Sequence, residues 1–351
     1  MINGVSFCIP TYNRFDTLVE ALNSVLELAK LDFLDHEIII SDDGNDDCVK
    51  RYIDELKNPR VSYILNKDHG QFNNLNNLID KSEKEWIIFL HDDDILDNDY
   101  LEYFLILNES AYEKAEIFFT DRSYINPSGK LIKNQTAFNS NRQQMTILEG
   151  KKVFDRLFFG GFEKEKFSFT APMVTGLAIK RDVLRQVRGF DLRLSVNSDA
   201  LFLNEVFFIT ERVLYVNKTL LSYRVVEDSE RGKPSKKGIV YGEMKKLFLY
   251  TLEFLKSRMN EADYLKMKEE KTSKFYKNSM EINGPLFWIA LRYEGNYTSR
   301  IDILIAIFKD ILKEFPPGRF NVKLYLILII SLLPQVILKG LYTNFYLKRS
   351  I

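Results

Sequence analysis

Residues 86–94 read Trp-Ile-Ile-Phe-Leu-His-Asp-Asp-Asp, an apolar run that ends in three consecutive aspartates. A continuous apolar run of this length is too short for a helix and predicts a buried strand over residues 86–90. Adjacent carboxylates repel one another, and a divalent cation bound by one or two of them would offset that repulsion. The other interpretation is a solvated acidic turn that caps the next helix, because Asp97 and Asp99 follow. This stretch alone does not decide between a metal site and a turn.

Short apolar runs alternate with amphipathic segments on both sides of this stretch. Between the runs, apolar residues such as Leu18, Leu22 and Val25 recur at helical spacing. Thr17 and Glu20 have the spacing of a capping box at the start of this helix. Strands that alternate with helices predict an α/β fold, with a mostly parallel sheet flanked by helices and ligands bound beyond the carboxyl ends of the strands. Further strands are expected at 5–9, 37–41, 61–65 and 116–120.

The pattern changes after residue 120. Residues 121–166 are irregular, polar and aromatic, which predicts a loop-rich region. From about residue 241 the chain shows helical patterns, so the sequence divides into residues 1–230 and a helical C-terminal region at residues 231–351. Between residues 174 and 226 we expect strands at 174–180, 213–216 and 220–226 and helices at 182–187 and 198–208.

Two other predicted strands also end in residues that suit ligand binding. The first strand leads into Pro10-Thr11-Tyr12-Asn13-Arg14, where Tyr12 is either an ordinary loop aromatic or a platform on which a base stacks. The second ends in Ser41-Asp42-Asp43-Gly44, and Asp-Gly is a common turn pair. The functional interpretation of this second group is a carboxylate that accepts a hydrogen bond from the edge of a base.

A further carboxylate, Asp199, opens a predicted helix whose next turns are apolar. The N-terminus of a helix stabilises an ionised carboxylate. Asp199 is therefore either part of a helix cap or a general base that the helix keeps ionised, and the sequence leaves both open.

Composition excludes several classes of protein. Acidic and basic residues balance at 49 each, so the chain lacks the basic footprint of a nucleic-acid-binding protein. Cys8 and Cys48 lie too far apart for a CxxC pair, and the histidines have no zinc-like spacing. GxGxxG, GxxxxGK[ST] and GxSxG motifs are absent from the sequence. The N-terminus has no basic leader, so we expect no signal peptide and a cytoplasmic protein.

The C-terminal region contains an apolar stretch at residues 324–338. This stretch is shorter than the roughly 20 apolar residues of a spanning helix, and Pro334 interrupts it. Basic residues around an apolar helix suit a segment that lies in an anionic membrane surface, which is our expectation; the alternative is a core helix. The basic residues are Arg319, Lys323, Lys339, Lys348 and Arg349.

Taken in order, these groups resemble the family 2 glycosyltransferases, which have the GT-A fold. The resemblance extends from about residue 5 to residue 226 and rests on the order and spacing of its motifs. The motifs are Ile9-Pro10-Thr11-Tyr12-Asn13-Arg14, Ser41-Asp42-Asp43-Gly44, residues 66–77 with Gly70, Phe89-Leu90-His91-Asp92-Asp93-Asp94, Thr175-Gly176, Gly189-Phe190-Asp191 and Ser198-Asp199.

The resemblance implies a nucleotide-sugar donor bound on the domain formed by residues 1–230. Pro10, Tyr12 and Asp43 would hold the nucleoside, and Arg14 would belong to the same donor-binding set. Asp92 would lie near the ribose and the diphosphate.

The resemblance also implies a metal and a base. Asp92-Asp93-Asp94 would correspond to the DxD motif of the family. Asp94, the last residue of this motif, would bind manganese or magnesium, and Asp93 would lie beside the donor. Asp199 would be the catalytic base, which takes a proton from the acceptor hydroxyl in a single displacement with inversion at the anomeric carbon.

The helical tail resembles those of bacterial members that build surface polysaccharide. Such a tail would bring the active site to a glycan or polyprenyl-linked acceptor at the inner face of the cell membrane. Two alternatives are a sugar nucleotidyltransferase, which normally carries a glycine-rich basic loop after the first strand, and a non-catalytic scaffold with the same fold.

Overall fold

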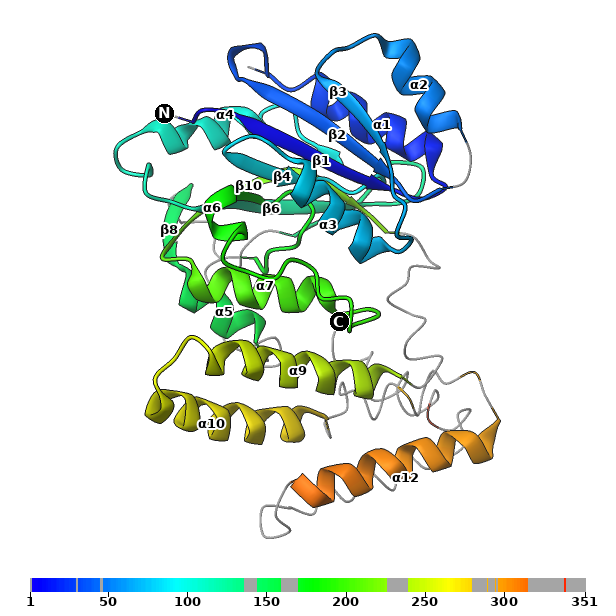
Figure 1. Cartoon of the computed structure of the whole chain (residues 1–351), viewed down its shortest axis with the longest axis vertical. Coiled ribbons are helices and arrows are strands. Elements are labelled where there is room, and N and C mark those ends of the chain that lie inside the picture. Colours follow the sequence, from blue (N-terminus) through cyan, green and yellow to red (C-terminus); the bar gives the residue numbers. More distant parts are fainter. Residues whose placement is uncertain are drawn as a thin grey trace. The chain divides into compact units, whose positions relative to one another are not determined.

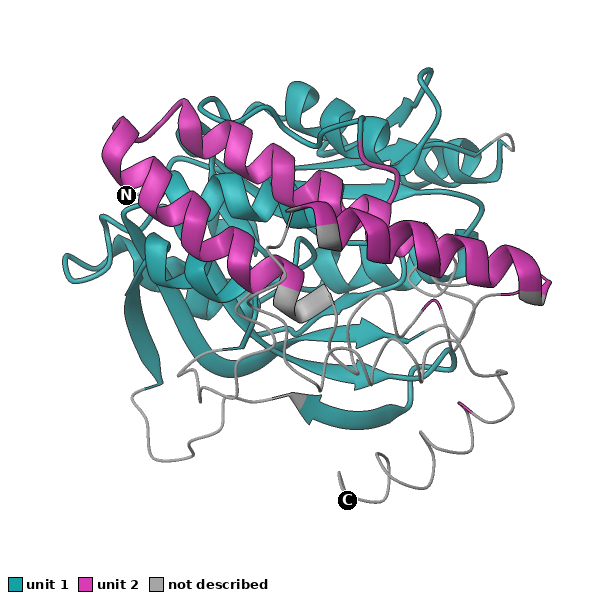
Figure 2. Ribbon diagram, turned by 90° about the horizontal axis from the view of Figure 1, so that it is seen from below, with its two compact units in different colours: residues 1–193, 198–227 teal, residues 194–197, 228–351 magenta. Residues whose placement is uncertain are grey.

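The computed structural model describes residues 2–29, 31–44, 47–135, 144–158, 170–225, 239–279, 289, 294, 296–314 and 338. The chain divides into two compact units (Figure 2). Unit 1 is Met1–Arg193 with Ser198–Glu227, and unit 2 is Leu194–Asn197 with Asp228–Ile351. Unit 1 carries the α/β elements, and unit 2 carries the helices of the C-terminal region.

Four parallel strands form the first half of the sheet in unit 1, in the order β3-β2-β1-β4 (Figure 1). The apolar residues of β1, β2 and β4 are buried on both faces, as expected for a parallel sheet covered by helices. The predicted α/β fold is confirmed, and these four strands differ from the predicted ones by at most two residues at either end. The strands are β1 (Val5–Thr11), β2 (His36–Asp42), β3 (Val61–Leu65) and β4 (Trp86–Phe89). The strand predicted at 116–120 instead extends to Ile125, and the one predicted at 174–180 covers only Ala178–Lys180.

The second half of the sheet continues beyond β4 as β9-β6-β10-β5 and is mixed. β9 runs antiparallel to both of its neighbours, whereas β10 runs parallel to β6 and antiparallel to β5. The bounds are β5 (Ile95–Leu96), β6 (Ile117–Ile125), β9 (Ala178–Lys180) and β10 (Arg212–Arg224).

β10 replaces the two strands predicted at 213–216 and 220–226. Its register against β6 shifts between Val216 and Thr219 and again between Thr219 and Leu221. These irregularities interrupt the apolar pattern without ending the pairing, so two apolar runs belong to one strand.

The prediction of a loop-rich region at 121–166 was wrong for its described part. It holds β7 (Leu131–Gln135), β8 (Met145–Glu149) and helix α5 (Gly150–Leu157). β7 pairs only with β6 and its described side chains are exposed, so it has no apolar alternation that sequence analysis could detect. β8 pairs with β10, a partner more than 60 residues further along the chain.

Helices cover both faces of the sheet in unit 1 (Figure 1). The buried side chains of α1, α2 and α4 share a core with one face, whereas α3 contacts Cys8 and α7 contacts Phe89 on the other face. The bounds are α1 (Phe15–Leu26), α2 (Cys48–Leu56), α3 (Gln71–Lys81), α4 (Tyr100–Phe104), α6 (Arg181–Leu184) and α7 (Ser198–Ile209), with 3-10 turns η1 (Leu31–Phe33) and η2 (Leu105–Asn108).

The predicted capping box at Thr17 and Glu20 was wrong. The helix α1 begins at Phe15, and its N-cap residue Arg14 makes no side-chain capping hydrogen bond. The Thr17 hydroxyl instead donates to the Arg14 carbonyl (3.3 Å), and the Glu20 carboxylate pairs with Arg224 at the end of β10.

Unit 2 contains the helices α9 (Val240–Lys256), α10 (Glu261–Ser279) and α12 (Tyr297–Glu314). α9 packs on α10 through the rings of Phe248 and Phe275, which stack with centroids 4.7 Å apart. In the part of the chain that the structure describes, we find no helix that is both long and apolar enough to cross a bilayer. The apolar stretch at 324–338 lies outside the described residues.

Candidate active site

The carboxyl ends of β1, β2 and β4 meet at one edge of the sheet because the three strands are parallel and adjacent. Thr11 lies beside Asp42 in the register, and the Leu90 N–H donates to the Cys8 carbonyl (3.0 Å). Residues 91–94 therefore leave the sheet next to the end of β1. The motifs that follow β1, β2 and β4 are far apart in the chain but come together here. Ligands of such sheets bind beyond the carboxyl ends of the strands, so this edge is where a ligand is expected.

Asp92 is buried and joins the loop after β4 to the loop after β1. Its Oδ2 accepts hydrogen bonds from the Thr11 hydroxyl (2.8 Å) and the Tyr12 main-chain N–H (3.3 Å). Burial raises the pKa of Asp92 to about 6; the Asp93 carboxylate raises it as well, and the Arg14 guanidinium offsets part of the increase.

Arg14 lies over Asp92 and Asp93. Its Nη1 is 2.6 Å from Oδ2 of Asp93 and 3.3 Å from Oδ1 of Asp92. The Arg14 side chain is 47% exposed, whereas the Asp92 and Asp93 side chains are 7% and 15% exposed. The guanidinium therefore lies on the solvent side of these ion pairs, where a ligand can reach it. The neighbouring Tyr12 side chain is also exposed.

Asp94 is the most deeply buried of the three aspartates, with a side chain that is 0% exposed. Its Oδ1 accepts a hydrogen bond from the Arg224 main-chain N–H (2.9 Å). Burial and the Asp93 carboxylate raise the pKa of Asp94, whereas the Arg224 N–H and a hydrogen bond from the Thr175 side chain lower it. An ionised carboxylate at this position requires a further positive partner.

A divalent cation fits this requirement. His91, Asp93 and Asp94 each offer one ligand atom, and these atoms lie within 4.8 Å of one another. Nδ1 of His91 lies 3.9 Å from Oδ2 of Asp94. Carboxylate oxygens with an imidazole nitrogen form a common ligand set for a divalent metal.

Asp43 lies at the end of β2 and is held by the loop that follows β3. Its Oδ1 accepts hydrogen bonds from the Asn66 amide (3.0 Å) and contacts Nδ1 of His69 (3.0 Å), while its Oδ2 accepts the Gly70 N–H (2.9 Å). Asp42 makes a separate local turn, since its Oδ1 accepts the Gly44 N–H (2.8 Å). Asp42 therefore forms the turn with Gly44 that the Asp-Gly pair suggested, whereas Asp43 is part of a wider polar network with Asn66, His69 and Gly70.

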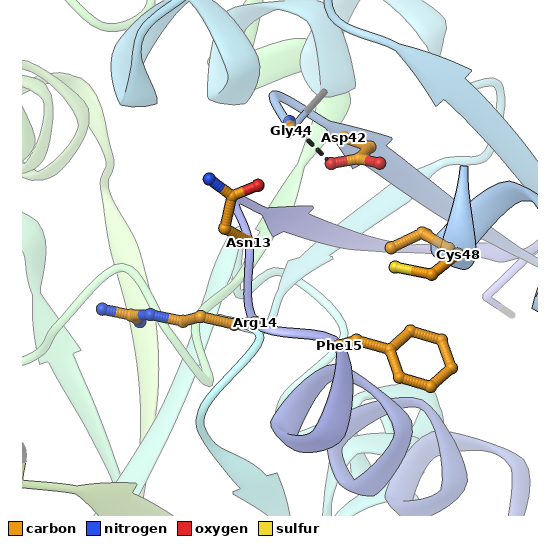
Figure 3. Close-up of a pocket in the computed structure, with 7 residues that line it drawn as sticks. Asn13, Arg14, Phe15, Asp42, Gly44 and Cys48 are labelled. Atoms are coloured by element: carbon orange, nitrogen blue, oxygen red, sulfur yellow. Dashed lines mark hydrogen bonds between the residues drawn. The ribbon is translucent and has the colours of Figure 1, made fainter. Parts of the chain in front are cut away.

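A pocket of about 220 Å³ lies beside these strand ends, between the starts of α1 and α2 (Figure 3). A β-carbon at Gly44 would lie 2.9 Å from both Asn13 Oδ1 and Asp42 Oδ1, so a larger residue here would displace these two side chains. Figure 3 shows the Arg14 side chain extending away from Phe15 and Cys48. Pockets for whole drug-sized ligands measure about 300–1,000 Å³, so a nucleotide sugar would not fit within this pocket alone.

Asp199 lies in the first turn of α7, where its Oδ1 accepts the Ala200 N–H (2.8 Å). α7 is packed on the Gly189-Phe190-Asp191 loop, because the rings of Phe190 and Phe202 stack with centroids 4.2 Å apart. The Asn76 amide of α3 holds the same loop by donating to the Phe190 carbonyl (2.8 Å) and accepting the Phe190 N–H (2.7 Å).

The structure thus brings together most of the residues that sequence analysis selected. Arg14, Asp92 and Asp93 are in direct contact, Asp94 follows them, and Tyr12 binds Asp92 through its main chain. Pro10 lies in β1 opposite Ser41, and Asp43 lies at the next strand end. Asp199 lies on a separate element, α7.

Sequence analysis missed two groups at this site. His91 stands directly before the aspartates, and that adjacency was a usable signal, but the search for zinc-like spacing passed over it. Arg224 contacts Asp93 and Asp94 from 130 residues further along the chain. The Tyr223-Arg224 pair matches the family pattern, but its contacts with these aspartates depend on the pairing of distant strands.

Comparisons with known proteins agree with this geometry. The chain matches the family model described as glycosyl transferase family 2 over residues 6–186, just over half of its length. It is 27% identical over 342 residues to the GalNAc(5)-diNAcBac-PP-undecaprenol beta-1,3-glucosyltransferase of Campylobacter jejuni, covering 96% of each chain. It is 33% identical over 100 residues to the poly-beta-1,6-N-acetyl-D-glucosamine synthase of Staphylococcus epidermidis, covering 28% of this chain and 24% of that enzyme.

Among solved structures, the chain is similar to S. aureus TarS 1–349 in complex with UDP-GlcNAc. The TM-score is 0.65 at 13% sequence identity, covering 97% of this chain and 92% of that one. This similarity confirms the GT-A fold. Together with the family match and the acidic strand ends, it leads to one conclusion: the chain belongs to glycosyl transferase family 2 and is a glycosyltransferase.

Proposed function

We propose that this protein transfers a hexose or N-acetylhexosamine from a nucleoside-diphosphate donor to a hydroxyl group of a glycan or polyprenyl-linked acceptor, with inversion. One observation carries the proposal: polar and acidic side chains that follow β1, β2 and β4 meet at one edge of the sheet, and the carboxylate of Asp94 among them is fully buried beside Asp93 and His91. A sugar nucleotidyltransferase or an inactive scaffold is less well supported, because the relatives that the chain matches are named glycosyltransferases or synthases.

The donor would lie across the ends of β1, β2 and β4. Tyr12, with a 58% exposed side chain, would stack on the base, with Pro10 beside it and Asp43 holding the loop that contacts the nucleoside. Arg14, which already binds carboxylates, would contact the diphosphate as the donor enters.

The metal would be manganese or magnesium, held by Asp94 with Asp93 and His91. An imidazole ligand favours manganese, because magnesium prefers oxygen ligands. When bound, the cation would supply positive charge that stabilises the departing diphosphate.

Asp199 would act as the base. The acceptor oxygen forms a bond to the anomeric carbon while the bond between that carbon and the diphosphate oxygen breaks, and the acceptor proton moves to the Asp199 carboxylate. The nucleoside diphosphate leaves with the electron pair of the broken bond. The N-terminus of α7 would keep Asp199 ionised for this role.

Residues 1–230 would form the catalytic domain, and residues 231–351 would be a helical region that contacts the inner face of the cell membrane. The support is the basic residues around 324–338 and the acceptor named for the Campylobacter relative, which is linked to undecaprenol. The protein would then act in the synthesis of cell-surface polysaccharide.

Thermal unfolding with UDP, dTDP or GDP, each with and without Mn²⁺, tests the donor and metal sites. A ligand at about 100 times its Kd stabilises the fold by roughly 2.7 kcal/mol. We expect one nucleotide to raise Tm by several degrees only when Mn²⁺ is present, and Asp94→Ala to abolish this increase.

Asp97→Asn is the matched control, because Asp97 is an exposed acid just after β5, three residues from Asp94, and its Oδ1 accepts the Asp99 N–H (3.1 Å). This variant should respond like the native protein. If no nucleotide raises Tm under any metal condition, the strand-end aspartates are structural and the proposal fails.

A further inference from the structure

Arg224, the last residue of β10, is a buried arginine to which the proposed reaction assigns no task. Its side chain is 2% exposed, although its ion-pair partner Glu20 is 51% exposed. Arginine is almost never buried to this extent unless its N–H groups have partners.

The partners of Arg224 all lie around the loop that contains the metal-ligating groups. Its Nε donates to the Asp93 carbonyl (2.8 Å), one terminal nitrogen donates to the Pro127 carbonyl (2.8 Å), and the other pairs with the Glu20 carboxylate. Its main-chain N–H donates to Oδ1 of Asp94 (2.9 Å). One residue thus joins the loop after β4 to α1, to the turn after β6 and to β10.

We infer that Arg224 is a positioning residue for the metal site, an inference that rests on the proposed function. Its planar guanidinium fixes the main chain at Asp93, and this places the Asp93 and Asp94 carboxylates so that they face the same point as His91. Arg224 contributes no ligand atom itself. It acts through the residues that do.

Geometry and charge predict opposite effects at this position. The positive charge of Arg224 repels a nearby cation. If Arg224 acted through its charge alone, its presence would therefore lower the affinity for the metal. Lysine keeps the charge but replaces the planar fork with a flexible ammonium group, which does not reproduce three donors in one plane. Arg224→Lys therefore separates the two roles, and it leaves the main-chain N–H to Asp94 in place.

The test measures Mn²⁺ affinity from the EPR signal of free Mn²⁺, using the full chain with Mn²⁺ alone and with Mn²⁺ plus UDP. Groups that orient metal ligands typically change metal affinity by about 10–100-fold when they are substituted. We expect Arg224→Lys to weaken Mn²⁺ binding at least tenfold and Glu20→Gln to weaken it by a smaller factor.

Asp16→Asn is the control for charge, because Asp16 is an exposed acid one turn earlier on α1. It should bind Mn²⁺ like the native chain. Circular dichroism shows whether each variant folds. If Arg224→Lys does not fold, Glu20→Gln decides the question, because Glu20 is half-exposed and glutamine keeps the size of its side chain.

The outcomes separate this inference from the proposed function. Native affinity in Arg224→Lys, even with a lowered Tm, overturns the positioning role and leaves the metal site intact. Equal losses in Glu20→Gln and Asp16→Asn also overturn it, because they would indicate an effect of net charge alone. If the native chain binds no Mn²⁺ with or without UDP, the proposed metal site and this inference both fail.

Discussion

At the residue scale, neighbouring carboxylates of this protein differ in their partners. Asp42 closes a turn with Gly44, whereas Asp43 binds Asn66, His69 and Gly70 across the sheet edge. A sequence pattern can indicate that such a pair is present, because residue types and spacing are local properties. It cannot assign the partners, because these depend on which strands lie side by side.

The same limit explains the error at Glu20. The spacing from Thr17 satisfied a local rule, but the partner of Glu20 is Arg224, which is 204 residues away in the chain. A capping hydrogen bond would stabilise the helix by about 1 kcal/mol. Glu20 instead supplies one of the three acceptors that the buried Arg224 guanidinium needs, and this need outweighs the cap.

Asp94→Asn should stabilise the metal-free protein at pH 8 but not near pH 4. The pKa of Asp94 is raised in the folded state, so its proton is held more tightly there than in the unfolded chain. Its destabilising effect is therefore absent below pH 4, grows as the pH rises towards the folded-state pKa, and is full above it. Asparagine is neutral at every pH and avoids this penalty.

The measurement is Tm as a function of pH in the presence of a chelator. Each 1 kcal/mol raises Tm by roughly 2–4 °C in a domain of 150–250 residues. Asp97→Asn, which removes an exposed charge three residues from Asp94, should show no such pH-dependent gain. An equal gain at pH 4 and pH 8 would contradict the burial of an ionised Asp94.

Asp199→Asn should lower kcat by about 10²–10⁴-fold, the usual contribution of a general base. Asparagine keeps the size of the side chain and can still accept the Ala200 N–H, so α7 should remain intact. Steady-state kinetics measures the loss. The thermal response to nucleotide and Mn²⁺ should be unchanged, and a loss of that response instead would move Asp199 to the donor site.

At the element scale, sequence periodicity located β1 to β4 and β6 because each is a short apolar run in a sheet that is covered on both faces. It failed for β7 and β8, which lie at the margins of the sheet and depend on strands far away in the sequence. The gathering of the site residues at one edge could be predicted, since parallel strands place their carboxyl ends together. The pair of hydrogen bonds between Asn76 and Phe190, which we call the clip, could not be predicted from the sequence. The clip joins α3 to a loop 114 residues away.

Gly189→Ala should break this clip and destabilise unit 1 by about 2–4 kcal/mol. Gly189 has φ +75°, a conformation that costs other residues roughly 1–3 kcal/mol. A β-carbon there would also lie 2.6 Å from Asn76 Oδ1, whose displacement loses hydrogen bonds worth about 0.5–1.5 kcal/mol each.

Urea unfolding measures this change. Gly242→Ala is the matched control, since Gly242 lies within α9 with no described atom within 4 Å of an added β-carbon. Alanine within a helix should be neutral or stabilising by about 0.5–1 kcal/mol. Similar effects at the two glycines would show that the clip contributes little.

At the scale of the whole molecule, the chain should bind anionic vesicles through its C-terminal region. We expect the full chain to sediment with phosphatidylglycerol vesicles at low salt and to be released as salt rises, because surface attraction is screened. Lys339→Glu with Lys348→Glu and Arg349→Glu should weaken this binding by at least tenfold, since each basic residue near the surface contributes about 1 kcal/mol.

Three charge reversals on α9 and α10, at Lys256, Lys266 and Lys268, keep the same net charge as a control. They should leave vesicle binding nearly unchanged. Equal losses in both triple variants would indicate attraction by net charge, and the C-terminal region would then have no special role.

The hydrogen bond from β10 to Asp94 has a consequence for how this enzyme can diverge in evolution. Its donor is a main-chain N–H, which every amino acid except proline possesses, so substitution at position 224 would rarely remove it. What this bond requires is the right number of residues between the irregular stretch at Val216–Leu221 and the end of the strand. A one-residue deletion there would turn the strand over and present a different group to Asp94. For this one hydrogen bond, what descendants must inherit is a count of residues, whereas the contact with the Asp93 carbonyl also requires the arginine side chain.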